Sequence, residues 1–133
     1  MSGSFTYRRA SAVIVLALLL SGAPAAHHSI SAVFDVSHTF TLAGALVKID
    51  WRNPHVQLFV QATDDRGQVD VWVIEGNTPS GFRSYDITKS DFEQAIGHTV
   101  AVQAVRAKDG SRYGLLQQIT FPDGRSVRFR EAQ

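Results

Sequence analysis

Residues 55–75 read HVQLFVQATDDRGQVDVWVIE, and the alternation within them gives the clearest indication of the architecture. In its first half every second side chain is apolar, at Val56, Leu58, Val60 and Ala62, which is the period of a half-buried strand. Asp64-Asp65-Arg66-Gly67 has the composition of a tight turn. On the returning segment, we expect Val69, Val71 and Val73 to point inward and Asp70, Trp72 and Ile74 outward. The stretch therefore predicts a β-hairpin.

A longer β-rich segment, residues 39–51, precedes this hairpin. Its apolar residues change parity, with Phe40, Leu42 and Leu46 on one side and Ile49 and Trp51 on the other. A change of parity inside one strand indicates a bulge or a sharp bend, which we place near Gly44 to Lys48. Asn53-Pro54 then ends the strand.

The segment from Gly76 to Gly97 changes period and contains signals for two short helices. Thr78 followed by Pro79 predicts the start of the first, and the capping-box spacing of Ser90 to Glu93 predicts the start of the second, which ends at Gly97. Strands are predicted again at residues 99–107, 113–121 and 126–130, because turn residues separate these β-rich stretches.

The predicted order of elements is three strands, a helical connection, two strands and a short extra strand. This is the order of an OB (oligonucleotide/oligosaccharide-binding) barrel. We therefore predict an all-β fold with short helices, arranged as a small, partly open barrel of five to six strands. A β-sandwich is the rival architecture. The helical insertion and the bent first strand favour the barrel.

The amino terminus has the residue order of a secretory signal peptide. Tyr7-Arg8-Arg9 precedes an apolar run from Ala12 to Leu20, and small residues follow this run. The run is shorter than the roughly 20 apolar residues of a transmembrane helix. Cleavage before Ala26 or before His27 fits the sequence. We assign residues 1–26 to the signal and residues 27–133 to one domain, and we expect a secreted, periplasmic protein.

The mature chain is expected to be close to neutral. Loss of Arg8 and Arg9 leaves 11 of the 13 basic residues against 12 acidic ones. Nucleic-acid-binding domains normally show a clear basic excess, so we expect no nucleic acid partner. The chain has no cysteine, so its stability is expected to come from the hydrophobic core without disulfides.

Several short elements together resemble a known family. They are His27-His28-Ser29, Trp51-Arg52-Asn53-Pro54-His55, Arg106-Ala107-Lys108-Asp109-Gly110 and Pro122-Asp123-Gly124. The chain resembles, over essentially all of its mature length, the small secreted bacterial proteins catalogued as domain of unknown function 6152. The resemblance implies export and a small β-barrel, and it implies no activity.

The turn from Trp51 to His55 has two interpretations. In the structural one, Trp51 plugs an end of the barrel, and His55 donates a hydrogen bond to a loop carbonyl. In the functional one, Trp51, Arg52 and His55 line the mouth of a ligand site. We favour the structural interpretation, because packing explains the tryptophan and turn formation explains Asn53-Pro54.

Phe59 and Trp72 are expected on the outward side of adjacent strands. In OB barrels, that face of strands two and three is where ligands lie. The alternative is that the segment from Ser29 to Val36 folds over these two aromatic rings as a cover.

The new amino terminus suggests a copper site. After cleavage before Ala26, the amine, two amides and the His28 imidazole form a square-planar nitrogen set for copper(II) or nickel(II). After cleavage before His27, the amine and ring of His27 chelate copper, with His28 or His55 completing the set. The alternative is that the two histidines are solvated and have no specific role.

No residue cluster in the sequence specifies a reaction. Asp64-Asp65 sits in a turn, Glu75 has no evident acid or base partner, and the chain has no Gly-x-Ser-x-Gly element. We therefore expect a noncatalytic exported binding or accessory module whose partner is a small molecule or another exported protein. The alternative is a copper-handling protein that uses His27, His28 and His55.

Overall fold

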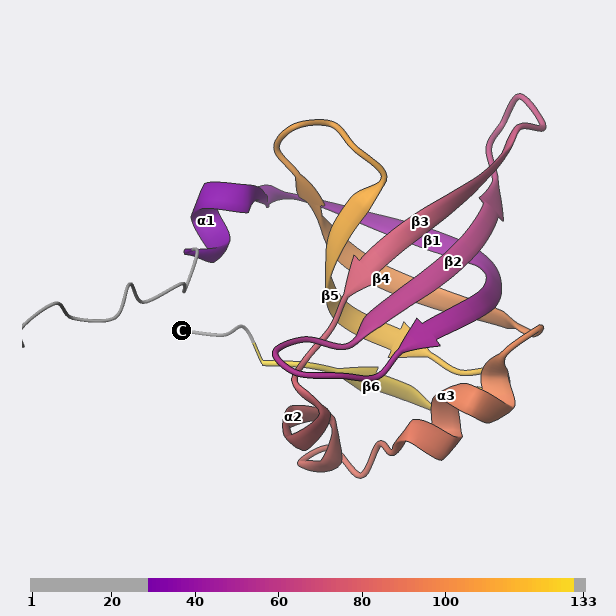
Figure 1. The fold of residues 1–133 in the computed structure, drawn as a ribbon. Helices are drawn as coiled ribbons and strands as arrows, with labels where there is room; N and C mark the ends of the chain where they lie inside the picture. Colours follow the sequence, from indigo (N-terminus) through magenta and orange to yellow (C-terminus); the bar gives the residue numbers. More distant parts are fainter. Residues whose placement is uncertain (1–28, 131–133) are drawn as a thin grey trace, which may run out of the picture.

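The computed structural model describes residues 29–130. The predicted signal peptide, both cleavage points, His27 and His28 lie outside these residues. The elements are α1 (Ile30–Val33), β1 (Phe34–Asp50), β2 (Gln57–Thr63), β3 (Val69–Glu75), α2 (Pro79–Arg83), α3 (Lys89–Ala95), β4 (Thr99–Ala107), β5 (Tyr113–Thr120) and β6 (Ser126–Arg128) (Figure 1).

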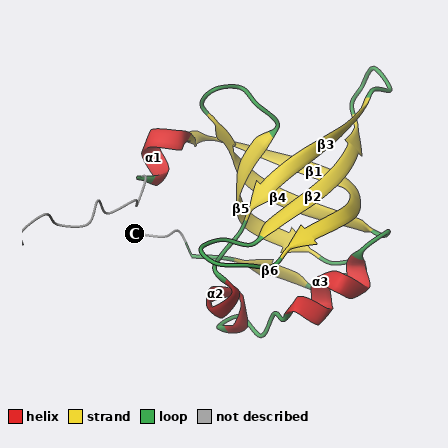
Figure 2. Ribbon diagram, viewed as in Figure 1, coloured by secondary structure: helices red, strands yellow, loops and turns green. Residues whose placement is uncertain are grey.

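The strands form a ring of five with β6 added at its side. The sheet order is β3-β2-β1-β4-β5-β6, and an additional pairing of β3 with β5 closes the ring. All pairs are antiparallel except β3 with β5. Helices α2 and α3 connect β3 to β4 and lie together at one end of the barrel (Figure 2). The predicted partly open barrel of OB type is confirmed.

Strand β1 bends, as its change of parity predicts. It pairs with β4 up to Ala45 and with β2 from Ala45 to Asp50, and the register with β2 shifts between Leu46 and Lys48. Gly44 lies so close to β2 that a β-carbon there would be 2.2 Å from the carbonyl oxygen of Gln61. Strand β1 can therefore pair with both β4 and β2, because glycine allows this close approach.

The inner faces of the ring strands and the two helices enclose one main core. The alternating positions of β2 are buried as predicted, and aromatic rings from α2, α3 and the chain after β6 fill the helical end. Phe82 lies 5.2 Å from Phe92 and 5.3 Å from Phe129 between ring centroids. Burial of a side chain of this size contributes roughly 1.5–3 kcal/mol.

The predicted parity of β3 is wrong. Leu58 stands opposite Ile74 and Val60 opposite Trp72, and directly opposite residues of an antiparallel pair share one face. Ile74 is fully buried and Trp72 packs against the core, while Val69 is 53% exposed. The register across the hairpin therefore puts Trp72 inside and the valines outside.

The second of the two predicted helices, which is α3, begins earlier than predicted. The cap is Thr88, whose backbone N–H donates to Asp91 Oδ2 at 2.7 Å, so the capping box is two residues upstream of Ser90. Glu93 forms instead an ion pair with Lys89 at 2.9 Å. The helix has its last residue at Ala95, and Gly97 follows with a φ of +84°, which agrees with the predicted end.

The segment before β1 does not cover Phe59 and Trp72. Phe34 is buried with Val105 and Ala107, and Ile30 packs against this small cluster. The Phe34 and Tyr113 rings lie 5.3 Å apart. The covering alternative is therefore wrong, because this segment packs on β4 and β5.

Gly44→Ala is expected to destabilise the protein by about 1–3 kcal/mol, since the new methyl group meets the backbone of Gln61. The free energy of unfolding from urea titration measures the effect. Ala43→Ser, at the exposed neighbouring position, is the control and should change it by less than about 0.5 kcal/mol. An unchanged midpoint for Gly44→Ala would contradict the described path of β1.

Candidate functional site

Three polar side chains meet where β3 and β5 join. Glu75 is the last residue of β3, Tyr113 is the first of β5, and His55 lies just before β2. The Tyr113 hydroxyl donates to Glu75 Oε2. His55 Nδ1 lies 3.8 Å from Glu75 Oε1. We call these three residues the Glu75 cluster.

The Glu75 carboxyl is largely withdrawn from water, with 20% of its side chain exposed. This burial raises the pKa of Glu75 above its ordinary value of 4.5, and the charge of nearby His55 opposes the rise. The carboxyl therefore holds its proton more tightly than an exposed glutamate does.

His55 makes the contact that its sequence position predicts. Its Nδ1 lies 3.2 Å from the carbonyl oxygen of Gly76, which is a loop carbonyl. A carbonyl oxygen only accepts, so Nδ1 carries a proton in this contact, and in the neutral form of the ring the lone pair lies on Nε2. The imidazole is 47% exposed.

Trp51 and Arg52 make different contacts from His55. The Trp51 ring lies 5.7 Å from Phe82 in a stacked arrangement and 5.8 Å from Phe92, so it plugs the helical end of the barrel as predicted. Arg52 Nη2 pairs with Asp50 Oδ2 at 2.7 Å, and the Arg52 side chain is 72% exposed. The three residues predicted to line one ligand mouth therefore have separate roles. Trp51 packs in the core, Arg52 forms a surface ion pair, and His55 belongs to the Glu75 cluster.

Apolar side chains adjoin the Glu75 cluster on the outside of β2 and β3. Phe59 stands opposite Val73, and Gln57 stands opposite Glu75. The same side of β3 carries Val71, which is 46% exposed. We call the outer face the surface formed by Gln57, Phe59, Val71, Val73, Glu75 and Tyr113.

Of the two aromatic residues predicted for one ligand face, Phe59 alone lies on the outer face. Its ring is half-buried, and Lys48 Nζ lies 4.8 Å from the ring centroid. Trp72 points inward, where its ring lies 4.9 Å from that of Phe40 and Arg106 lies 5.2 Å from its centroid. The prediction that the two aromatic rings share a face is wrong.

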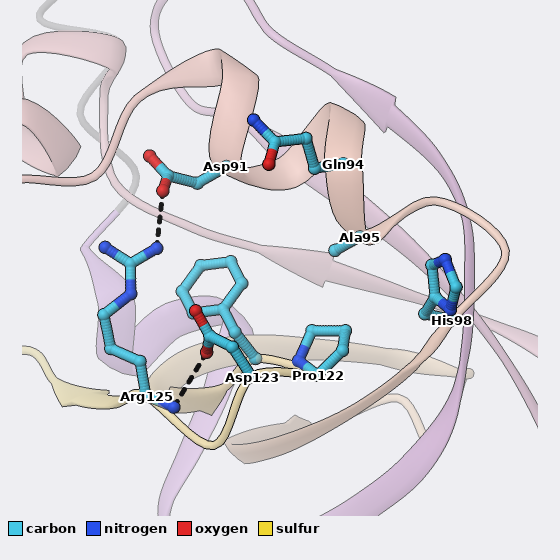
Figure 3. Close-up of a pocket in the computed structure, with 8 residues that line it drawn as sticks. Asp91, Gln94, Ala95, His98, Pro122, Asp123 and Arg125 are labelled. Carbon is cyan, nitrogen blue, oxygen red and sulfur yellow. Dashed lines mark hydrogen bonds and ion pairs between the residues drawn. The ribbon is translucent and has the colours of Figure 1, made fainter.

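A pocket of about 220 Å³ lies at the helical end of the barrel, between α3 and the turn before β6 (Figure 3). Asp91 Oδ1 accepts from Arg125 Nη2 at 2.5 Å, and the Arg125 guanidinium lies 4.8 Å from the centroid of the Phe121 ring. His98 lies across the pocket from this ion pair (Figure 3). Asp91 also caps α3, so the ion pair ties the turn to the helix.

A family model described as a family of unknown function (DUF6152) matches residues 15–118. The chain belongs to this family. The search of curated proteins and the search of solved structures found no match. The matched span contains the Glu75 cluster and the whole outer face of this DUF6152 protein.

The described part of the DUF6152 chain holds one of the three histidines predicted to bind copper. That residue is His55, and its acidic neighbour is Glu75. Within residues 29–130, no three His, Cys, Asp or Glu side chains gather closely enough to hold a metal ion. In the same residues, no helix is both long and apolar enough to cross a membrane.

Sequence reasoning missed two members of the Glu75 cluster. Glu75 was expected to lack a partner, and Tyr113 carried no distinguishing pattern. The predicted barrel type could have indicated the meeting of Glu75 and Tyr113, since closing a ring of this type brings strand three against strand five. Val73 and Tyr113 are paired in this way in the DUF6152 fold.

Replacing Glu75 with glutamine tests the burial of this carboxyl. Since its folded pKa is raised, the stability that the protonated carboxyl contributes is present below about pH 4.5 and is lost as pH rises through the folded pKa. Glu75→Gln should therefore gain stability relative to the parent protein between acidic and neutral pH.

The measurement is the urea midpoint of both proteins across this range, with Glu93→Gln on the exposed side of α3 as control. A difference between Glu75→Gln and the parent that does not change with pH would contradict the assigned burial.

Proposed function

We propose that this protein is a noncatalytic binding or accessory module that acts after export, and that the outer face binds its small-molecule or exported protein partner. The barrel type supports this, because strands two and three form the usual ligand face of OB folds. The leader sequence supports export.

The observation that carries the proposal is an apolar surface that ends in a polar cluster. Val71 is 46% exposed, Phe59 and Val73 are half-buried, and Glu75 and Tyr113 follow at the end. Binding sites typically combine apolar contact area with a few fixed polar groups. The outer face thus suits a partner with an apolar body and a hydrogen-bonding group.

The contacts of Glu75 favour binding over catalysis. One carboxylate oxygen accepts from Tyr113, and the other faces His55. These groups hold one another in place, and such fixed polar groups orient a partner.

Chemical-shift mapping tests the outer face. The amide resonances of the labelled mature protein are followed during titration with a panel of small apolar amides and carboxylates. Shifts should cluster at Gln57, Phe59, Val71, Val73 and Tyr113, and Val71→Lys should weaken the binding by about tenfold or more, because a charge enters the apolar contact.

Ile96→Lys is the matched control, since Ile96 is 41% exposed at the end of α3. This control should bind as the parent protein does. Shifts that cluster elsewhere, or equal effects of the two lysine variants, would contradict the proposal.

Copper handling is the second candidate, and the surroundings of His55 favour it. A metal-binding histidine normally donates its second ring N–H to a carbonyl or carboxylate. His55 Nδ1 has the Gly76 carbonyl at 3.2 Å and Glu75 at 3.8 Å, which leaves Nε2 for a metal. We propose that this nitrogen joins His27 and His28 around copper(II).

Copper titration of the mature protein tests this candidate. A tight one-to-one complex is expected, which weakens strongly when the terminal amine is blocked and by roughly tenfold or more in His55→Gln. His98→Gln, at an exposed histidine between α3 and β4, should leave the affinity unchanged. Loose copper uptake that needs neither the amine nor His55 would remove the candidate.

A further inference from the structure

Four polar side chains form a row across the outside of four strands away from the outer face. Thr41 of β1 stands opposite Gln103 of β4, Gln103 opposite Gln118 of β5, and Gln118 opposite Arg128 of β6. Since directly opposite residues of antiparallel strands share a face, the four side chains lie side by side. The row ends in a cation.

A depression of about 260 Å³ lies beside this row. The next row of opposite residues contains Ala43, Ala101, Thr120 and Ser126. Ala101 and its opposite neighbour Ala43 both carry small side chains, and this leaves a hollow over β4. The lining residues are Thr41, Ala101, Val102, Gln103, Gln118, Thr120 and Arg128.

The charge of the depression is unbalanced. Among residues 29–130, Arg128 is its single charged lining residue, and no carboxylate from this part of the chain lines it. Within residues 29–130, Arg128 forms no ion pair. Its Nη2 donates to Gln103 Oε1 at 3.3 Å, and this bond turns the guanidinium along the row. The depression therefore presents a positive charge with its other donors open to a ligand.

The remaining polar groups are held by their neighbours. Gln118 Nε2 and Thr120 Oγ1 both donate to Ser126 Oγ at 3.0 Å. The Gln118 carbonyl and the Thr41 hydroxyl remain at the surface beside them. Amides and hydroxyls both donate and accept, so the lining suits a ligand with several hydroxyl groups.

We propose that this depression binds a small hydroxylated carboxylate, such as a sugar acid. Arg128 pairs with the carboxylate, because a guanidinium forms strong charge-assisted hydrogen bonds to this group. Thr41, Gln103 and Gln118 bond the hydroxyls, and Ala101 leaves the space for the carbon chain. The site shares no residue with the outer face, and β5 is the one strand that contributes to both, so the site stands independently of the proposed function.

Chemical-shift titration with gluconate tests the site, with neutral glucose and inorganic phosphate as comparison probes. Gluconate should shift the amides of Ala101, Gln103, Gln118 and Arg128 in a saturable way. Arg128→Gln should weaken gluconate binding by about tenfold or more, since a hydrogen bond to a charged group is lost. Ala101→Leu, which fills the hollow and keeps the charge, should weaken it similarly.

Arg83→Gln is the matched control, because Arg83 is an exposed arginine in α2, and it should bind gluconate as the parent protein does. Circular dichroism checks that every variant keeps its fold. Gluconate binding that survives both Arg128→Gln and Ala101→Leu overturns the site. Equal binding of glucose overturns the role of the charge, and equal binding of phosphate overturns the role of the hydroxyls.

Discussion

Three residue pairs join β3 to β5 in parallel, Val73 with Tyr113, Ile74 with Gly114 and Glu75 with Leu115, and this pairing turns a curved sheet into a ring. Without it, β3 would be an edge strand along its whole length, with its backbone groups and the inner side of Ile74 open to water. Closure also places the Tyr113 hydroxyl on the Glu75 carboxylate. The core and the candidate site thus depend on one short contact between strands far apart in the chain.

Local patterns predicted most of the strands and the bend. The alternation from Val56 to Ala62 determined both the position and the orientation of β2, because only one parity is apolar enough to be buried. The parity of β3 could not be obtained in this way, since Trp72, Val73 and Ile74 are all apolar and either face could be buried. The pairing of Val60 with Trp72 decides the orientation, and that pairing is a property of the hairpin rather than of the strand.

The candidate site illustrates the same division between local and distant information. The bond from His55 to a loop carbonyl followed from the turn at Asn53-Pro54, whereas the meeting of Glu75 with Tyr113 required the register between β3 and β5. The row from Thr41 to Arg128 likewise exists only in the folded sheet, where four strands align polar residues that are widely separated in sequence. Polar residues of this kind give no periodic signal, because exposed strand positions accept almost any polar side chain.

Contacts across β3 and β5 in solution test ring closure most directly. Nuclear Overhauser effects between the backbone protons of Ile74 and those of Gly114 and Leu115 are the measurement. A closed ring should give the parallel pattern of contacts, together with slow hydrogen exchange of the amides in this pairing. Fast exchange at these amides and no contact between the two strands would show an open sheet and would contradict it.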